Sequence, residues 1–212
     1  MTTIKNIGLI LFVSCFYVLT TAAQSPYEAG MQKALEHLGK GEHQQATALL
    51  ERISKAEQEK WIPNYYLAQA LVYQSFAVEN STDKTALLEK AKLAIAGAHE
   101  KSPNNSEVMT LEGLLYTAYV VIDPANYAMK YEPKIIALHQ KAIKLNPDNP
   151  RAHLNLIQYN MNKGKWFGED MTPYCNKLKA LIPKFENQTS EMPFAPSHGQ
   201  AQAEEIINSC NE

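Results

Sequence analysis

The chain has 212 residues, a formal net charge of −2 and a hydrophobic fraction of 45%. This length fits one or two domains. The near-neutral charge argues against a nucleic-acid partner and against electrostatic attraction to an anionic membrane, because both need a basic patch.

The first 23 residues have the features of an export signal. Lys5 is their only charged residue, Ile7 to Leu19 is apolar, and Thr21-Ala22-Ala23 supplies the small residues that precede a cleavage site. The apolar run is about 13 residues long, whereas a transmembrane helix needs roughly 20, so a membrane anchor is the less favoured alternative. We therefore expect residues 1–23 to be removed. The mature chain is expected in the periplasm or outside the cell, with no stable membrane insertion.

The rest of the chain is predicted to be helical nearly throughout. Ala, Leu, Lys, Glu and Gln dominate it, and Pro and Gly fall between segments of helical periodicity. Met31, Ala34, Leu35 and Leu38, for example, have the i, i+3, i+4, i+7 spacing of one buried stripe. The predicted helices form four pairs: 26–38 with 42–56, 61–78 with 83–101, 105–122 with 130–145, and 150–162 with 171–182.

The connections within these pairs are predicted from polar residues, glycine and proline. Thr82 or Asp83 is expected to cap the helix at 83–101. Residues 125–129 are expected to be a connector after Asp123-Pro124, and Gly164 to Gly168 to join the last two helices.

Beyond Pro183 the helical pattern lapses. Residues 186–199 are predicted to be an irregular strap, and residues 201–209 a helix that caps the array, because an array of helix pairs must cover its last apolar face. The expected division is therefore a signal at 1–23, a helical repeat domain at 24–185, and a strap with a capping helix at 186–212.

One sequence pattern occurs twice, with a period of 44 residues. In each copy the residues of one helix face precede a proline, and another helical segment follows at once, which is typical of a helical repeat. The two copies are Ala91-x3-Ile95-x2-Ala98-x4-Pro103 and Ile135-x3-His139-x2-Ala142-x4-Pro147.

This pattern resembles the tetratricopeptide repeat family, which pairs antiparallel helices and places small residues and a proline at fixed positions. Gly113 and Tyr116 match the small and aromatic positions of the third unit, and Ala98 and Pro103 match the second. The chain departs from the family in its period, which is about 34 residues there. The resemblance covers roughly residues 26–185. It implies an all-α fold of antiparallel helix hairpins, a tetratricopeptide-like α-solenoid, with a C-terminal capping helix.

In the resembled family the first helix of each pair lines a concave groove. The resemblance therefore implies a mixed polar and apolar groove here, and an exported interaction module that binds an unknown protein or peptide. The implied partner-binding residues are Tyr65, Gln69, Tyr73, Glu107, Thr110, Leu114, Thr117, Arg151, Leu154, Gln158 and Asn162.

The C-terminal part resembles the tail of small exported repeat proteins of Bacteroidetes-type bacteria. The matching residues are Phe194, Pro196, Gly199, Ala203, Ile206 and Cys210. This resemblance implies export and helical architecture, and it implies no particular activity.

No sequence motif indicates catalysis or a cofactor. Phosphate-binding glycine loops, a dinucleotide fingerprint and Gly-x-Ser-x-Gly are absent. His139 and His153 fall in adjacent helices, but a metal site needs three or four ligands. Glu107 and Glu112 share a helix without sharing a face. We therefore expect that the protein is not an enzyme and that it holds no cofactor and no metal. Two alternatives remain: an enzyme or enzyme subunit with a site in the groove, and a structural envelope component.

Two contacts between distant residues are also expected. Removal of the signal takes Cys15 with it and leaves Cys175 and Cys210, which should form a disulfide because export exposes the chain to oxidising conditions. This bond would hold the capping helix on the last pair. The family's pairing of positions further implies that Gly113 meets Ala98 in a tight helix–helix contact.

Overall fold

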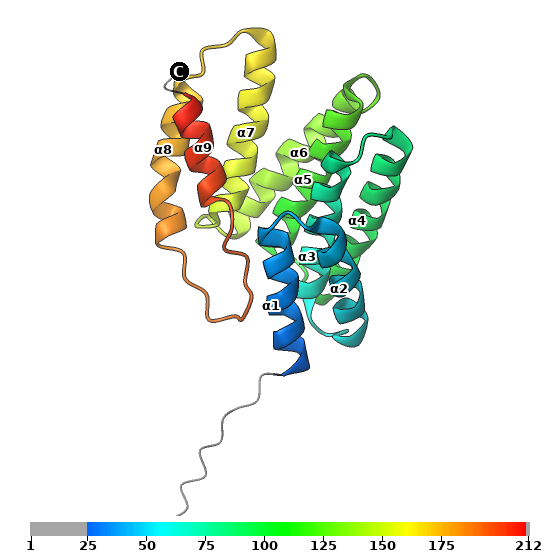
Figure 1. Ribbon diagram of the computed structural model, residues 1–212. Coiled ribbons are helices and arrows are strands. Elements are labelled where there is room, and N and C mark those ends of the chain that lie inside the picture. The colour runs from blue at the N-terminus through cyan, green and yellow to red at the C-terminus, as the bar shows by residue number, and fades with distance from the viewer. Residues whose placement is uncertain (1–24, 211–212) are drawn as a thin grey trace, which may run out of the picture.

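The computed structural model describes residues 25–210, and the predicted signal segment lies outside them. Within this range the chain forms nine α-helices and no strand (Figure 1). The predicted all-α class is therefore confirmed. The helices are α1 (Pro26–Gly39), α2 (His43–Ala56), α3 (Trp61–Ala77), α4 (Ser81–Lys101), α5 (Ser106–Ile122), α6 (Pro124–Leu145), α7 (Pro150–Phe167), α8 (Thr172–Glu186) and α9 (Gln200–Ser209).

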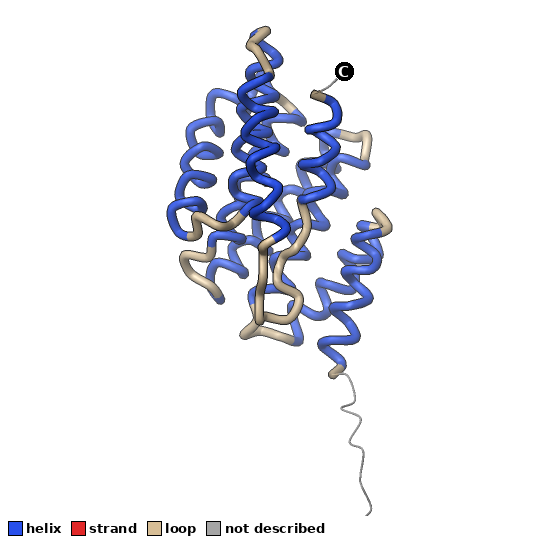
Figure 2. The backbone as a smooth tube through the Cα atoms, turned by 90° about the vertical axis from the view of Figure 1, so that its left-hand side faces the viewer, coloured by secondary structure: helices blue, strands red, loops and turns tan. Residues whose placement is uncertain are grey.

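The first eight helices form four hairpins, α1–α2, α3–α4, α5–α6 and α7–α8, and successive hairpins lie side by side (Figures 1 and 2). α3 and α5 are buried on most sides, as their largely apolar sequences require. One apolar core joins α1 to α6, and a second joins α7, α8 and α9. No helix in residues 25–210 is long and apolar enough to cross a membrane.

Asparagine side chains begin three of the helices. Asn80, Asn105 and Asn149 each accept hydrogen bonds from two backbone N–H groups in the first turns of α4, α5 and α7. Asn80 therefore caps α4 in place of Thr82 or Asp83, whose N–H groups are the donors. As a result, α4 begins two residues before its predicted start.

Two predicted connections are helical in the structure. Residues 125–129 belong to α6, because the Asp123 side chain accepts a hydrogen bond from the Asn126 N–H and Pro124 occupies the first helical turn. Pro124 thus ends one helix and begins the next. α7 continues past buried Gly164 and ends at Gly168, whose φ of 72° closes the helix.

The tight contact expected at Gly113 exists, but its partner is His139 rather than Ala98. A Cβ built at Gly113 would lie 2.5 Å from His139 Cε1, and its three nearest atoms all belong to that ring. The contact therefore joins α5 to α6 within one hairpin and does not cross between hairpins. His139 is fully buried, and neither ring nitrogen has a hydrogen-bond partner among the described residues. Burial lowers its pKa to about 4, so the ring is neutral at pH 7.

Cys175 of α8 and Cys210, directly after α9, form a disulfide with their Cα atoms 6.2 Å apart. The expected pairing is therefore present in the structure. Ala203 of α9 is fully buried in the apolar core that α9 shares with α7 and α8. The bond fixes the last helix of the described chain to the last hairpin.

Candidate ligand cleft

The strap (residues 187–199) and α9 pack against the helices that carry the predicted groove residues. The chain's own C-terminal segment therefore covers much of the groove that the family resemblance implied. Tyr65, Gln69, Thr110, Arg151 and Leu154 are buried, Tyr73, Glu107, Leu114, Thr117 and Gln158 are partly buried, and Asn162 is exposed.

The structure brings most of these residues together, although the strap lies among them. A narrow cavity is lined by Tyr65, Gln69, Tyr73, Thr110, Leu114, Arg151 and Leu154, together with His198, Gly199 and Gln202. Glu107 is joined to this group through Arg151, and Gln158 through a bond that its Oε1 accepts from Gln202 Nε2 at 3.0 Å. Thr117 and Asn162 do not line the cavity.

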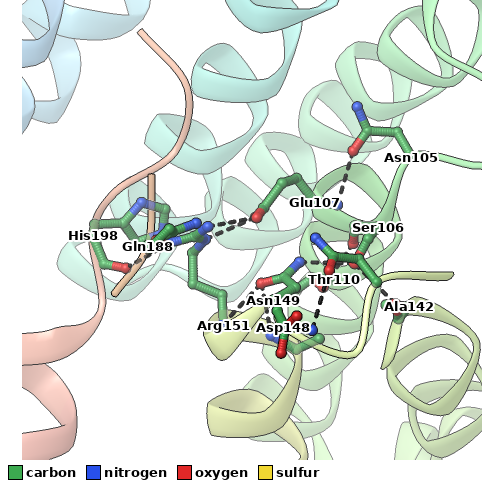
Figure 3. Close-up of polar contacts among 12 residues, drawn as sticks. Asn105, Ser106, Glu107, Thr110, Ala142, Asp148, Asn149, Arg151, Gln188 and His198 are labelled. Carbon is green, nitrogen blue, oxygen red and sulfur yellow. Dashed lines mark hydrogen bonds and ion pairs between the residues drawn. The ribbon is translucent and has the colours of Figure 1, made fainter. Parts of the chain in front are cut away.

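Arg151 is the polar centre of this region (Figure 3). Its side chain is 3% exposed and donates twice to the Glu107 carboxylate, from Nε at 2.8 Å and from Nη2 at 2.5 Å. Nη1 donates to Gln188 Oε1 at 2.8 Å and to the His198 carbonyl oxygen at 3.2 Å. A buried guanidinium needs such a set of partners, because an unpaired buried charge is costly.

A second polar group fixes the start of α7. Asn149 Nδ2 donates to Ser106 Oγ at 2.8 Å, and this hydroxyl donates to the Ala142 carbonyl oxygen at 2.9 Å (Figure 3). These bonds join α5, α6 and the start of α7, and Arg151 lies in the first turn of α7.

His198 links the strap to α3. Gln69 Nε2 donates to His198 Nε2 at 2.7 Å, so that ring nitrogen is the acceptor and carries no proton. Burial and the nearby Arg151 charge lower the pKa of His198 to about 3. The ring is therefore neutral over the physiological pH range.

A larger cleft opens between α1, α3 and the strap. Its volume is about 390 Å³. α1 contributes Leu35, Leu38 and Gly39, α3 contributes Tyr66, Gln69 and Tyr73, the strap contributes Ser197, His198 and Gly199, and α9 contributes Gln202.

The cleft has an uncharged lining with polar groups at a few points. Burial raises the pKa of Tyr66 and of Tyr73, so both phenols stay protonated and can donate hydrogen bonds. No lysine, arginine, aspartate or glutamate is among the residues that line it in the described chain. The arrangement suits a ligand with large apolar faces and few polar groups.

The other candidate residues of the sequence do not assemble into a site. His139 is buried against Gly113, whereas His153 Nε2 lies 2.9 Å from the Pro147 carbonyl oxygen. Burial alone would raise the pKa of Glu112, but bonds from His99 and Lys134 lower it, as expected for a paired carboxylate. Within residues 25–210, no three His, Cys, Asp or Glu side chains are placed to hold a metal ion.

Sequence reasoning missed part of the cleft. Leu35, Leu38 and Tyr66 lie on first helices of their pairs, so the family rule that selected Tyr65 and Tyr73 could have been extended to α1. Ser197 and His198 had no such signal, because nothing in an irregular segment predicts which surface it will cover.

Comparison with known proteins finds a likeness among the solved structures. No family model and no curated protein sequence matches the chain. A solved structure, the HusA haemophore from Porphyromonas gingivalis, superposes with a TM-score of 0.76 and 22% sequence identity, covering 88% of this chain and 93% of that one. At this identity the match shows the fold: the chain shares the all-helical architecture of a haemophore from a Bacteroidetes bacterium.

Proposed function

We propose that this protein is an exported, non-catalytic binding protein that holds a flat, largely apolar small molecule of the haem class in the cleft. The observation that carries the proposal is the uncharged lining of that cleft. Leu35, Leu38, Tyr66 and Tyr73 offer apolar contact area, and Gln69 offers a polar group that can orient a ligand. Protein sites for small ligands have this mixture of apolar walls and few polar groups.

The residues present fit the apolar ring of a haem better than its charged edge. The Arg151 guanidinium already binds Glu107 and the strap, so it is not a free partner for a carboxylate. The carboxylates of a haem are therefore expected to remain in water, while the ring is removed from it. Burial of apolar surface would supply most of the binding free energy.

The likeness to the HusA haemophore supports the choice of ligand class. The name of that protein states a haem-related role, and its fold matches over most of both chains. The uncharged lining of the cleft is compatible with a ligand of this class. Export, which the apolar segment at residues 7–19 predicts, fits a carrier that works outside the cytoplasm.

A titration with haemin, followed through its visible absorption, tests the proposal. We expect saturable binding to one site, and roughly tenfold weaker binding by Leu38→Gln, because a polar amide replaces apolar contact area. Leu93→Gln is the matched control, since Leu93 is 73% exposed on α4 and does not line the cleft. Metal-free protoporphyrin, titrated in parallel, separates contacts of the ring from contacts of the iron.

Equal haemin affinities for Leu38→Gln and Leu93→Gln would place the ligand elsewhere. A wild-type protein that shows no saturable binding would contradict the haem-class ligand itself.

A protein partner, which the resemblance to the tetratricopeptide repeat family implies, is the second candidate. The observation that favours it is the tip of α7, where Trp166 and Phe167 are 86% and 69% exposed. Exposed aromatic side chains are enriched in protein interfaces. Capture experiments with Trp166→Ala and Phe167→Ala would separate this surface from the cleft.

A further inference from the structure

One wall of the cleft has no secondary structure of its own. The strap, residues 187–199, contains no helix or strand, yet it supplies Ser197, His198 and Gly199 to the cleft. Such a segment has no ladder of backbone hydrogen bonds, so its position depends on contacts at its ends and along its side chains. The shape of the cleft therefore depends on the groups that fix the strap.

Arg151 fixes both ends of the strap at once. Through Nη1 it binds the Gln188 side chain at the start and the His198 carbonyl oxygen at the end (Figure 3). Its other two bonds anchor it to Glu107 of α5. Neither Gln188 nor Glu107 lines the cleft, so this part of the network acts on the cleft only through the strap.

The disulfide fixes the segment that follows. Cys175 of α8 and Cys210 hold the far end of α9, while Ala203 is buried against α7 and α8. The strap is thus a loop between two anchored helices. Closing such a loop restricts the conformations open to the segment within it.

We propose that Arg151, Gln188 and the Cys175–Cys210 disulfide are positioning groups of the cleft, which set its affinity for ligand by holding the strap as one wall. None of them needs to touch the ligand through its side chain. This inference rests on the proposed function, since it assigns affinity to the same cleft.

Two sets of variants test the inference with haemin as the probe. Gln188→Ala removes an acceptor from the Arg151 guanidinium, whereas Gln188→Glu retains an acceptor at the same place and is the conservative control. Cys175→Ser with Cys210→Ser removes the disulfide without a reductant, which would also reduce the haem iron. Hydrogen exchange of residues 187–199, measured on the same samples without ligand, reports release of the strap.

We expect Gln188→Ala to bind haemin roughly tenfold more weakly, because a hydrogen bond to a charged group contributes about that factor. The double serine variant should also bind more weakly, because the loop that contains the strap is no longer closed. Gln188→Glu should bind as the wild type does. Strap exchange should rise in the two weakened variants, while exchange in α3 and α5 stays unchanged. A general loss of stability would instead raise exchange throughout the chain.

The outcomes separate the two proposals. If the wild type binds haemin and all variants bind equally well, the positioning inference is overturned and the proposed function stands. If Gln188→Glu is as weak as Gln188→Ala, the role of the Arg151 contact is overturned. Absence of saturable binding by the wild type overturns both proposals.

Discussion

The contact between Gly113 and His139 gives the sharpest stability prediction. In Gly113→Ala the new methyl group would lie 2.5 Å from His139 Cε1 and 2.6 Å from Nε2, closer than packed side-chain atoms can approach one another. The ring is fully buried between α5 and α6 and has little room to move. Overpacking of this kind costs about 1–3 kcal/mol. Alanine regains about 1 kcal/mol of helix propensity over glycine. We therefore expect Gly113→Ala to lower the free energy of unfolding by about 1 kcal/mol, and Gly113→Leu to lower it further.

The sign of the effect should reverse when His139 is removed. In a His139→Ala background the clash is gone, and Gly113→Ala should then stabilise the protein by up to about 1 kcal/mol. Urea unfolding of the four proteins in this cycle measures the coupling, which should be about 1–3 kcal/mol. The midpoint of thermal unfolding should shift by roughly 2–4 °C for each kcal/mol of stability in a chain of this size.

Additive effects in the cycle would refute this account of the helix contact. So would a Gly113→Ala protein that is more stable than the wild type while His139 is present.

Three further predictions concern buried polar groups and the strap. The pKa of His139 is about 4 in the folded protein and 6.5 in the unfolded chain, so the unfolded state binds more protons below pH 6.5. The free energy of unfolding should therefore fall by up to about 3 kcal/mol as the pH drops toward 4. Urea unfolding at several pH values should show a shallower pH dependence of this free energy in His139→Ala. Asn149→Ala removes the α7 cap and a partner of Ser106, and should cost about 1–3 kcal/mol in the same assay. Gly199→Ala should loosen the strap, because Gly199 has a φ of 111° and a Cβ there would meet Phe185 at 3.0 Å. We expect faster proteolysis within residues 187–199 of this variant.

The sequence predicted the helical elements well wherever the apolar spacing was regular. α1, α2, α3 and α5 begin and end within one residue of their predicted limits. Some of the differences fall at residues that usually break a helix. Asp123 and Pro124 end α5 but also begin α6, and Gly164 is buried inside α7. Tertiary packing overrides local preference at such positions.

The candidate site was less accessible to sequence reasoning. Tyr65, Gln69, Tyr73 and Arg151, which the family resemblance implied as groove residues, line one narrow cavity in the structure. These residues contact the chain's own C-terminal segment, because the strap lies over them. Which surface an irregular segment covers depends on side-chain partners such as the bond between Arg151 and the His198 carbonyl oxygen. A pattern of helical spacing contains no information on that contact.

The most direct test of the ligand cleft is hydrogen exchange with and without haemin. Binding in the cleft predicts slower exchange in residues 35–39 of α1, residues 66–73 of α3 and residues 197–202, with no change at the α7 tip around Trp166. Protection confined to the α7 tip, or to another surface, would contradict the assignment of the ligand to the cleft.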